Sequence, residues 1–222
     1  MLGMTRRKWL AASTVIFPAA GALMGRESRA HSSETPTEKH VSTFSPPLSG
    51  RDVMRERFFP NVALTTHQGN EVRFYDDLIK DKAVVVNMMY TSCDDACPLI
   101  TANLARVQEL LTDRMGRDLF FYSITVEPKQ DTPEKLSDYA KAYGIGPGWL
   151  FLTGQPDNVE LLRQKLGYVD PNPEVDKDKS LHSGMLRYGN EPSSLWASCQ
   201  GGAKPEWIAE TISWVLPKAT KT

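Results

Sequence analysis

The sequence is poor in cysteine, in histidine and in net charge. It holds three cysteines and four histidines in 222 residues, and its formal net charge is −1. Three cysteines are too few for a disulfide-stapled scaffold, and an odd number leaves at least one without an internal partner. A nearly neutral chain without a basic stripe offers no electrostatic basis for binding nucleic acid. A hydrophobic content of 41% is ordinary for a soluble protein, and the length suits one domain with a core.

The sequence also lacks a long uninterrupted apolar run. The best candidate, from Trp9 to Met24, is broken by Pro18 and Gly21 and falls short of the roughly 20 residues that a membrane-spanning helix needs. Basic residues 6–8 precede this stretch, and small residues at 28 and 30 follow it. This three-part layout is typical of an export signal.

The stretch "TRRKWL" also resembles the twin-arginine export signal, with Trp9 where phenylalanine is more usual. We therefore expect residues 1–30 to be an export signal of twin-arginine or general type, with a retained anchor as the alternative. In either case we expect the domain to be exported and to work in the periplasm or at the outer face of the cytoplasmic membrane. It would contact the membrane only if this segment is retained.

The remaining chain divides into a tether, one domain and a tail. Residues 31–57 begin with a polar stretch rich in Ser, Thr and Pro, which predicts a flexible tether because such a composition cannot bury a core. We place the folded domain at residues 58–217 and a short tail at 218–222.

Strand and helix patterns alternate along the domain. We expect a hairpin with its turn at 68–70, a buried strand at 83–90, and a helix from Cys97 that ends at Gly116. Further expected strands are 118–128, 149–154 and part of 182–192, and further expected helices are 75–79, 131–144, 156–167 and 204–216. This order predicts an α/β sandwich with a central mixed sheet and an N-terminal hairpin.

Two of the cysteines stand at a position where α/β folds place their sites. Cys93 follows the apolar strand 83–90, and Cys97 falls in the first turn of the next helix. A helix N-terminus stabilises thiolate through its unpaired N–H groups and its dipole. The pair can therefore be a redox dithiol or a soft-metal site. A structural disulfide is the third reading, although closing so small a loop gains little chain entropy.

Three segments together resemble the Sco/SenC family. They are "YTSCDDACP" (90–98), "TVEPKQDTPEKLSDYAKAYG" (125–144) and the late histidine in "DKSLHSGM" (178–185), and the resemblance extends from about residue 58 to 216. It implies a thioredoxin-like three-layer sandwich that handles copper or thiols during the assembly of respiratory cytochrome oxidases.

The resemblance also implies roles for individual residues. Cys93 and Cys97 match the family's cysteine pair, and His182 matches its metal-binding histidine. Two thiolates suit Cu(I), and an added imidazole can also hold Cu(II). The implied function is a copper chaperone that delivers copper to a respiratory cuproenzyme such as cytochrome c oxidase, with an apo-cuproenzyme or oxidase subunit as partner.

Two other functions stay open. In a thiol–disulfide oxidoreductase, Cys93 and Cys97 would be catalytic and would reduce partner cysteines before metal insertion. A peroxide-reducing thiol protein is less favoured: Thr91 is present, but no arginine stands close to the pair in sequence.

Several other residues could have either a structural or a functional role. Cys199 is a small buried side chain near the last helix, a resolving thiol, or a cysteine that carries a palmitoyl-type modification or links to a partner. We expect Met88 and Met89 to fill the core, and Met185 to be core filler rather than a thioether ligand. Asp131 is expected first as part of a helix cap at 131–134, and Glu127 or Asp131 is alternatively an acidic group beside the cysteines.

The remaining histidines lie outside these motifs. We expect His67 to be exposed in the hairpin turn, and His31 and His40 to be solvated in the tether. Cleavage after Ala30 would make His31 the amino-terminal residue, whose free amine and imidazole can chelate Cu(II).

Overall fold

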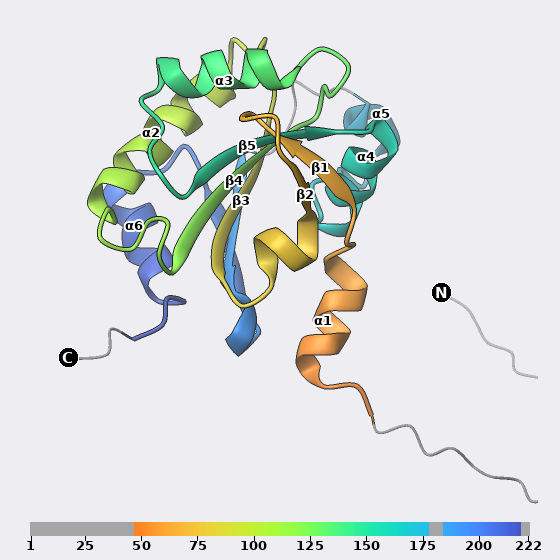
Figure 1. Ribbon diagram of the computed structural model, residues 1–222, viewed down its shortest axis with the longest axis vertical. Coiled ribbons are helices and arrows are strands. Elements are labelled where there is room, and N and C mark those ends of the chain that lie inside the picture. Colours follow the sequence, from red (N-terminus) through yellow and green to blue (C-terminus); the bar gives the residue numbers. More distant parts are fainter. Residues whose placement is uncertain (1–46, 178–183, 219–222) are drawn as a thin grey trace, which may run out of the picture. The chain divides into compact units, whose positions relative to one another are not determined.

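A mixed sheet forms the centre of the computed structural model, which describes residues 47–177 and 184–218. The seven strands of these residues are arranged in the order β2-β1-β5-β4-β3-β6-β7 (Figure 1). Strand β3 pairs in parallel with β4, and β4 pairs in parallel with β5, while the other neighbours are antiparallel. The strands are β1 (Ala63–Thr66), β2 (Glu71–Arg73), β3 (Ala83–Met89), β4 (Leu119–Thr125), β5 (Trp149–Gly154), β6 (Met185–Asn190) and β7 (Leu195–Gln200).

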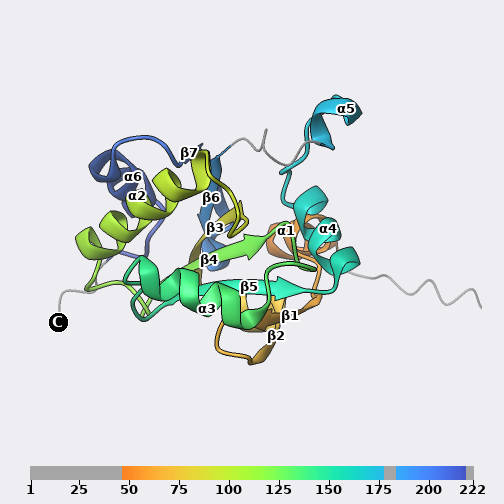
Figure 2. The same cartoon turned by 90° about the horizontal axis from the view of Figure 1, so that it is seen from above.

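Helices cover both faces of the sheet and make a three-layer sandwich (Figure 2). On one face lie α2 (Ala96–Leu110), α3 (Pro133–Ala142) and α6 (Pro205–Ser213), and on the other lie η1 (Phe74–Ile79) and α4 (Pro156–Lys165). Two short segments, α5 (Pro173–Asp176) and η3 (Glu191–Ser193), complete the described elements. The expected α/β sandwich with a mixed sheet and an N-terminal hairpin is confirmed.

The central strand β3 is buried along its whole length. Val85 and Met89 pack into the core under α2, α3 and α6, whereas Val84, Val86 and Met88 pack into the core on the α4 side. Alternate residues of a strand point to opposite faces, so a strand between two helical layers must be apolar on both. Met88 and Met89 are thus core residues, as expected.

The first helix corrects the predicted domain boundary. Residues 50–57, which we assigned to the tether, form most of helix α1 (Gly50–Phe58). Ser49 caps this helix through a reciprocal hydrogen-bonded box with Asp52. The polar composition of residues 31–57 led to their assignment as a tether. Helix α1 nevertheless belongs to the domain, because charged contacts as well as apolar packing hold it there.

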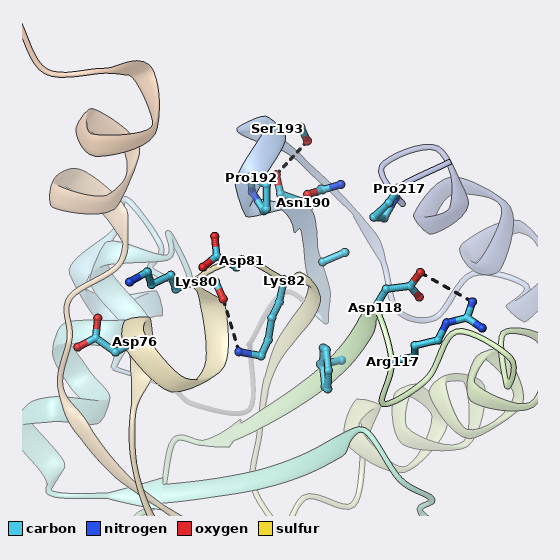
Figure 3. A pocket seen from close by; sticks show the side chains of 12 residues that line it. Asp76, Lys80, Asp81, Lys82, Arg117, Asp118, Asn190, Pro192, Ser193 and Pro217 are labelled. Carbon is cyan, nitrogen blue, oxygen red and sulfur yellow. Dashed lines mark hydrogen bonds and ion pairs between the residues drawn. The ribbon is translucent and has the colours of Figure 1, made fainter. Parts of the chain in front are cut away.

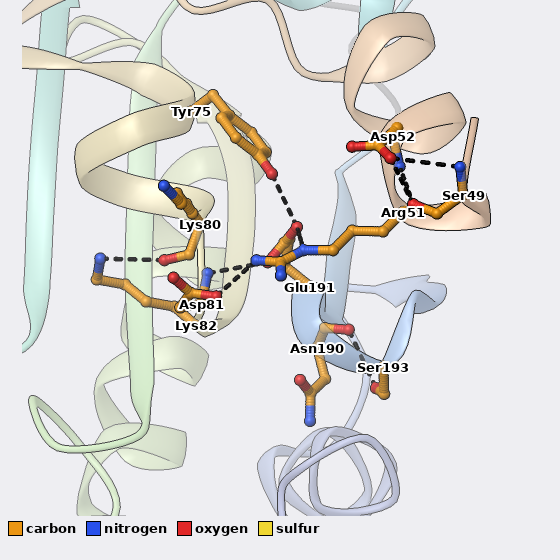
Figure 4. Close-up of polar contacts among 10 residues, drawn as sticks. All are labelled: Ser49, Arg51, Asp52, Tyr75, Lys80, Asp81, Lys82, Asn190, Glu191 and Ser193. Carbon is orange, nitrogen blue, oxygen red and sulfur yellow. Dashed lines mark hydrogen bonds and ion pairs between the residues drawn. The ribbon is translucent and has the colours of Figure 1, made fainter. Parts of the chain in front are cut away.

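That charged attachment is an ion pair between α1 and the end of β6 (Figure 4). The Arg51 guanidinium donates to both carboxylate oxygens of Glu191 at 2.6 Å and to Asp81 at 2.5 Å. The Tyr75 hydroxyl and the Asp81 backbone N–H also donate to Glu191, at 2.9 Å each. The side chain of Glu191 is only 4% exposed, so this network fixes α1 beside the beginning of β3.

Several element boundaries differ from the sequence predictions, and one strand was not predicted. The helix that begins near Cys97 ends at Leu110, before Gly116, which lies at a φ of +72° in the turn that follows. Strand β4 ends at Thr125 rather than at residue 128. Strand β7 (Leu195–Gln200) was not expected, because its alternating small and polar residues do not make an apolar run.

Candidate thiol site

The cysteine pair lies in the turn between β3 and α2, at the carboxyl end of the central strand. Cys93 is half-buried in this turn, and its backbone N–H donates to the Tyr90 carbonyl at 3.3 Å. Cys97 is the second residue of α2, with Pro98 directly after it. The sequence prediction for both residues is confirmed in position: a buried strand delivers the first thiol, and the first helical turn holds the second.

Several donors converge on the Cys93 sulfur. Burial alone would raise the pKa of Cys93, but hydrogen bonds from the Cys97 thiol, from the backbone N–H groups of Cys97 and Asp95, and from the Tyr90 hydroxyl bring that pKa below its usual value. The carboxylate of the capping position Asp95 makes no capping hydrogen bond. The free N–H groups of the first turn of α2 are therefore directed at Cys93.

The other two groups of the cluster are held in their protonated forms. Burial, together with the hydrogen bond to Cys93, raises the pKa of Cys97 to about 12. Burial also raises the pKa of Tyr90 to about 12, with the hydrogen bond to Cys93 as the next cause. Within this cluster Cys93 is therefore the sulfur that ionises more easily, and Cys97 and Tyr90 are hydrogen-bond donors to it. The role of Tyr90 was not foreseen from the sequence.

A buried carboxylate fixes the turn that carries Cys93. Asp131 is 1% exposed and accepts hydrogen bonds from the Thr91 backbone N–H at 3.0 Å, from the Thr91 hydroxyl, and from the Thr125 hydroxyl. These contacts join the end of β4 to the residue that stands two positions before Cys93. Asp131 therefore acts beside the thiol site, and Thr132, not Asp131, supplies the side-chain cap of α3.

A second acidic residue touches the same turn from outside. Ser92 donates from its hydroxyl to the Glu127 carboxylate at 3.4 Å, and Glu127 contributes to the raised pKa of Tyr90 through its charge. The reading of Glu127 and Asp131 as acidic groups near the cysteines is therefore confirmed for both. The Asp131 carboxylate also engages the hydroxyl of Thr91, which donates a hydrogen bond to it.

The described residues supply the two sulfurs of a metal site but not a third ligand. Within residues 47–177 and 184–218, no group of three or more His, Cys, Asp or Glu side chains is arranged to hold a metal ion. The third expected ligand, His182, lies outside the described residues, as do His31 and His40. Two adjacent sulfurs, one with a lowered pKa, fit a soft ion such as Cu(I).

The other residues considered as ligands or reactive groups, Cys199, Met185 and His67, lie in or against strands of the sheet. Cys199 is 6% exposed in β7, where burial raises the pKa of its thiol, with a hydrogen bond from Thr211 acting in the other direction. Its reading as a small buried side chain near the last helix is confirmed. Met185 is half-buried at the start of β6. His67 is not exposed as expected: its Nδ1 accepts from the Phe151 backbone N–H at 3.1 Å, which holds it against β5.

A large open pocket lies at the opposite end of β3 from the thiols (Figure 3). It measures about 710 Å³ and is lined by charged side chains that include Lys80, Lys82 and Arg117. Of its acidic residues, Asp81 and Asp118 are paired with Arg51 and Arg114 respectively, and Asp76 accepts a hydrogen bond from the Asn61 side chain at 2.6 Å. The pocket has no part in the chemistry of the cysteines, whose position is set by the turn and the helix terminus.

Comparison with known proteins places the whole described domain in one family. The family model described as SCO1/SenC matches residues 53–216. A protein of Stutzerimonas stutzeri whose name suggests copper binding is 27% identical over 164 residues, which are 73% of this chain and 78% of that protein.

Solved structures share the fold. The copper-bound crystal structure of yeast Sco1 superimposes with a TM-score of 0.55 at 22% identity, covering 68% of this chain and 87% of that one. BsSco, described as a member of the Sco family of cytochrome c oxidase assembly proteins, gives 0.58 at 20% identity, with 72% and 93% covered. A SCO1/SenC family lipoprotein from Bacillus anthracis gives 0.57 at 21% identity, with 72% and 95% covered. These likenesses confirm the expected thioredoxin-like fold.

Among the helices of the described residues, none is both long enough and apolar enough to cross a bilayer.

Proposed function

Because the chain belongs to the SCO1/SenC family, we propose that Cys93, Cys97 and His182 bind one copper ion, as Cu(I) or Cu(II), and pass it to a protein partner. The observation that carries the proposal is the turn that aims the helix N-terminus, the Cys97 thiol and the Tyr90 hydroxyl at Cys93. The copper ion is the cargo of this function.

The donor chemistry supports this assignment. A sulfur stabilised as thiolate is a good ligand for soft copper, and a second sulfur beside it allows two-coordinate binding. Both cysteines are only half-buried, so a partner's ligands can approach them. Adding the neutral imidazole of His182 would make the set suitable for Cu(II) as well.

Copper titration of the purified domain tests the proposal. We expect the domain to bind about one equivalent of copper and to show a thiolate-to-Cu(II) charge-transfer band. Cys93→Ser should remove the band, and His182→Ala should weaken binding by at least on the order of tenfold. Cys199→Ala and His40→Ala are the matched controls and should bind as the unaltered protein does. If Cys93→Ser and His182→Ala both bound copper with the stoichiometry and affinity of the unaltered protein, the assignment would be refuted.

A thiol–disulfide oxidoreductase is the second candidate, favoured by the asymmetry within the pair. Cys93 has a lowered pKa, whereas Cys97 has a raised one, and this is the arrangement of an attacking and a resolving thiol. Cys93 would attack a partner disulfide and form a mixed disulfide. Cys97 would then displace the partner thiolate, leaving Cys93–Cys97 oxidised and the partner cysteines reduced. Rapid turnover of a disulfide peptide without retained copper would favour this function.

For the partner and the location, the proposal follows the family. We infer that the acceptor is an apo-cuproenzyme such as a cytochrome oxidase subunit, and that residues 1–30 export the domain or anchor it outside the cytoplasm. BsSco belongs to a family of cytochrome c oxidase assembly proteins, and the Bacillus anthracis relative is a lipoprotein, which supports these two points. Detecting the chain in a periplasmic or membrane fraction, and losing that fractionation with both Arg6 and Arg7 replaced by Lys, tests the twin-arginine route.

A further inference from the structure

Strand β7 is the outer strand of the sheet over its whole length. In the described residues it pairs with β6 on one side only, from Met185↔Gln200 to Asn190↔Leu195. Every second residue of such a strand directs its N–H and C=O away from the sheet. Figure 2 shows β7 at this edge, with the layers of α2 and α6 on one side and of α1 and α4 on the other.

This edge lacks the usual devices that prevent pairing. Proteins protect an open edge with lysine, proline, a bulge or a very short strand. The sequence of β7, "LWASCQ", contains neither a charged residue nor proline, and its register with β6 is continuous through Gln200. Leu195 is 51% exposed. The opposite edge strand, β2 (Glu71–Arg73), is by contrast short and carries a charge at each end.

A groove of about 420 Å³ runs beside β7 on the α4 side of the sheet. Its apolar wall is built by Met54, Phe58 and Phe59 from the end of α1 and by Trp196 from β7. The Phe59 and Trp196 rings lie 4.5 Å apart, centre to centre. Side chains of a strand added to β7 would point alternately into this groove and away from it.

The rim of the groove carries two cations without carboxylate partners in the described part of the chain. Arg187 donates to the Gly167 carbonyl at 2.8 Å and lies over the Tyr168 ring, but its Nε is buried with no hydrogen-bond partner. Lys165, at the end of α4, lines the same groove. Because neither cation has a carboxylate partner among the described residues, an incoming acidic side chain would be favoured at this rim.

From these observations we propose that β7 accepts an additional strand: an extended segment of a partner protein in which apolar and acidic residues alternate. The backbone edge supplies main-chain hydrogen bonds, the groove takes the apolar side chains, and Arg187 and Lys165 select the acidic ones. The site is distinct from the thiols and needs no copper. It is joined to the helix that carries Cys97, because Asn103 of α2 donates to the carbonyl of Gly201, directly after β7, at 2.9 Å.

Binding of a synthetic peptide tests the proposal. The probe is the capped hexapeptide Ac-Val-Glu-Val-Glu-Val-Glu-NH2, titrated into the folded full-length chain by calorimetry and by amide hydrogen exchange. We expect binding that slows exchange at the outward amides of β7. The same peptide with alternate amides N-methylated should bind on the order of tenfold more weakly, because it cannot complete the ladder. A peptide with Lys in place of Glu should lose at least as much.

Variants locate the site and separate it from copper binding. Arg187→Gln and Lys165→Gln should each weaken binding of the acidic peptide several-fold, whereas Lys135→Gln on α3 should not. All three should bind copper unchanged, so failure here is distinguishable from failure of the copper proposal. Equal binding of the N-methylated peptide, or protection at amides outside β7, would overturn the inference. A concentration-dependent dimer that protects the same amides would assign the edge to a second copy of this chain and overturn it too.

Discussion

The buried carboxylate of Asp131 accepts a hydrogen bond from the backbone N–H of Thr91 at 3.0 Å, and so fixes the turn that presents Cys93. The Thr91 and Thr125 hydroxyls donate to the same carboxylate. Asp131 is separated from Cys93 by 38 positions in the sequence, yet it determines the backbone conformation two residues before that sulfur. The position of the Cys93 thiol therefore depends on the chain after β4 as well as on β3 and α2.

Removing the Asp131 carboxylate should loosen this turn. We expect Asp131→Ala to lower the free energy of unfolding by about 2–4 kcal/mol, since three buried donors lose their acceptor. Asp131→Asn should cost less than half as much, because its carbonyl oxygen can replace the oxygen that binds the Thr91 N–H and Thr125. Urea denaturation measures the change.

The same variants test the effect on the thiols. A purely structural role for Asp131 would leave the Cys93–Cys97 reduction potential of the folded protein unaltered in Asp131→Asn. We expect that potential to shift, and Thr125→Val, which removes one hydrogen bond to the carboxylate but leaves both bonds from Thr91, to shift it less.

Cys199 should be inert in the folded protein. Its thiol is buried and has a raised pKa, so its reaction with iodoacetamide should be on the order of tenfold slower, or more, than that of Cys93. Mass spectrometry of labelled peptides before and after denaturation measures the difference. A rapidly formed disulfide between Cys199 and either site cysteine would instead support the resolving-thiol role.

Stability should fall in acid through Glu191. Burial would raise the pKa of Glu191, but hydrogen bonds from Arg51, the Asp81 N–H and Tyr75 lower it below its ordinary value of 4.5. A carboxyl whose folded pKa is lowered contributes stability above its unfolded pKa, and this contribution is lost as the pH falls through the folded value. The loss should therefore begin below about pH 4.5.

Replacing Glu191 isolates that contribution. Glu191→Gln should lower the free energy of unfolding at pH 7 by about 1–3 kcal/mol, and it should flatten the dependence on pH below 4.5. Denaturant titrations of both proteins between pH 3 and 7 test this expectation. Parallel pH profiles for the two proteins would show that Glu191 does not titrate as described.

The packing of β7 on β6 depends on a missing side chain. A Cβ at Gly189 would lie 2.4 Å from the Trp196 ring and 2.5 Å from the Leu195 carbonyl oxygen. Gly189→Ala should therefore destabilise the fold by about 1–3 kcal/mol. Gly50→Ala, where the added Cβ meets no atom within 4 Å, is the matched control and should leave the unfolding midpoint almost unchanged. If Gly189→Ala left the free energy of unfolding unchanged, this would contradict the tight approach of Trp196 to Gly189.

The sequence predicted those features that local pattern determines. Strand β5 (Trp149–Gly154) has the predicted bounds, and β3 and the first turn of α2 place Cys93 and Cys97 as expected. These elements have strong apolar periodicity or a helix-start signal such as Pro98.

Features that depend on distant contacts could not be read in the same way. Helix α1 looked like tether because its attachment depends on Glu191, 140 positions after Arg51. Asp131 looked like a helix cap because its partners Thr91 and Thr125 lie on other elements. The Tyr90 hydroxyl was a missed donor to Cys93: its position directly after an apolar strand and three residues before the cysteine was the available signal.

The ion pair between Arg51 and Glu191 and the cysteine pair lie at opposite ends of strand β3. The ion pair joins α1 to the beginning of β3, whereas the sulfurs follow the end of that strand, seven residues on, or roughly 20 Å away at the rise of a β-strand. The first described helix, α1, is thus attached at one end of β3, and the thiols lie at the other end. The Arg51–Glu191 ion pair therefore holds the end of the domain at which the described chain begins, and that attachment does not cover the end that carries the two thiols.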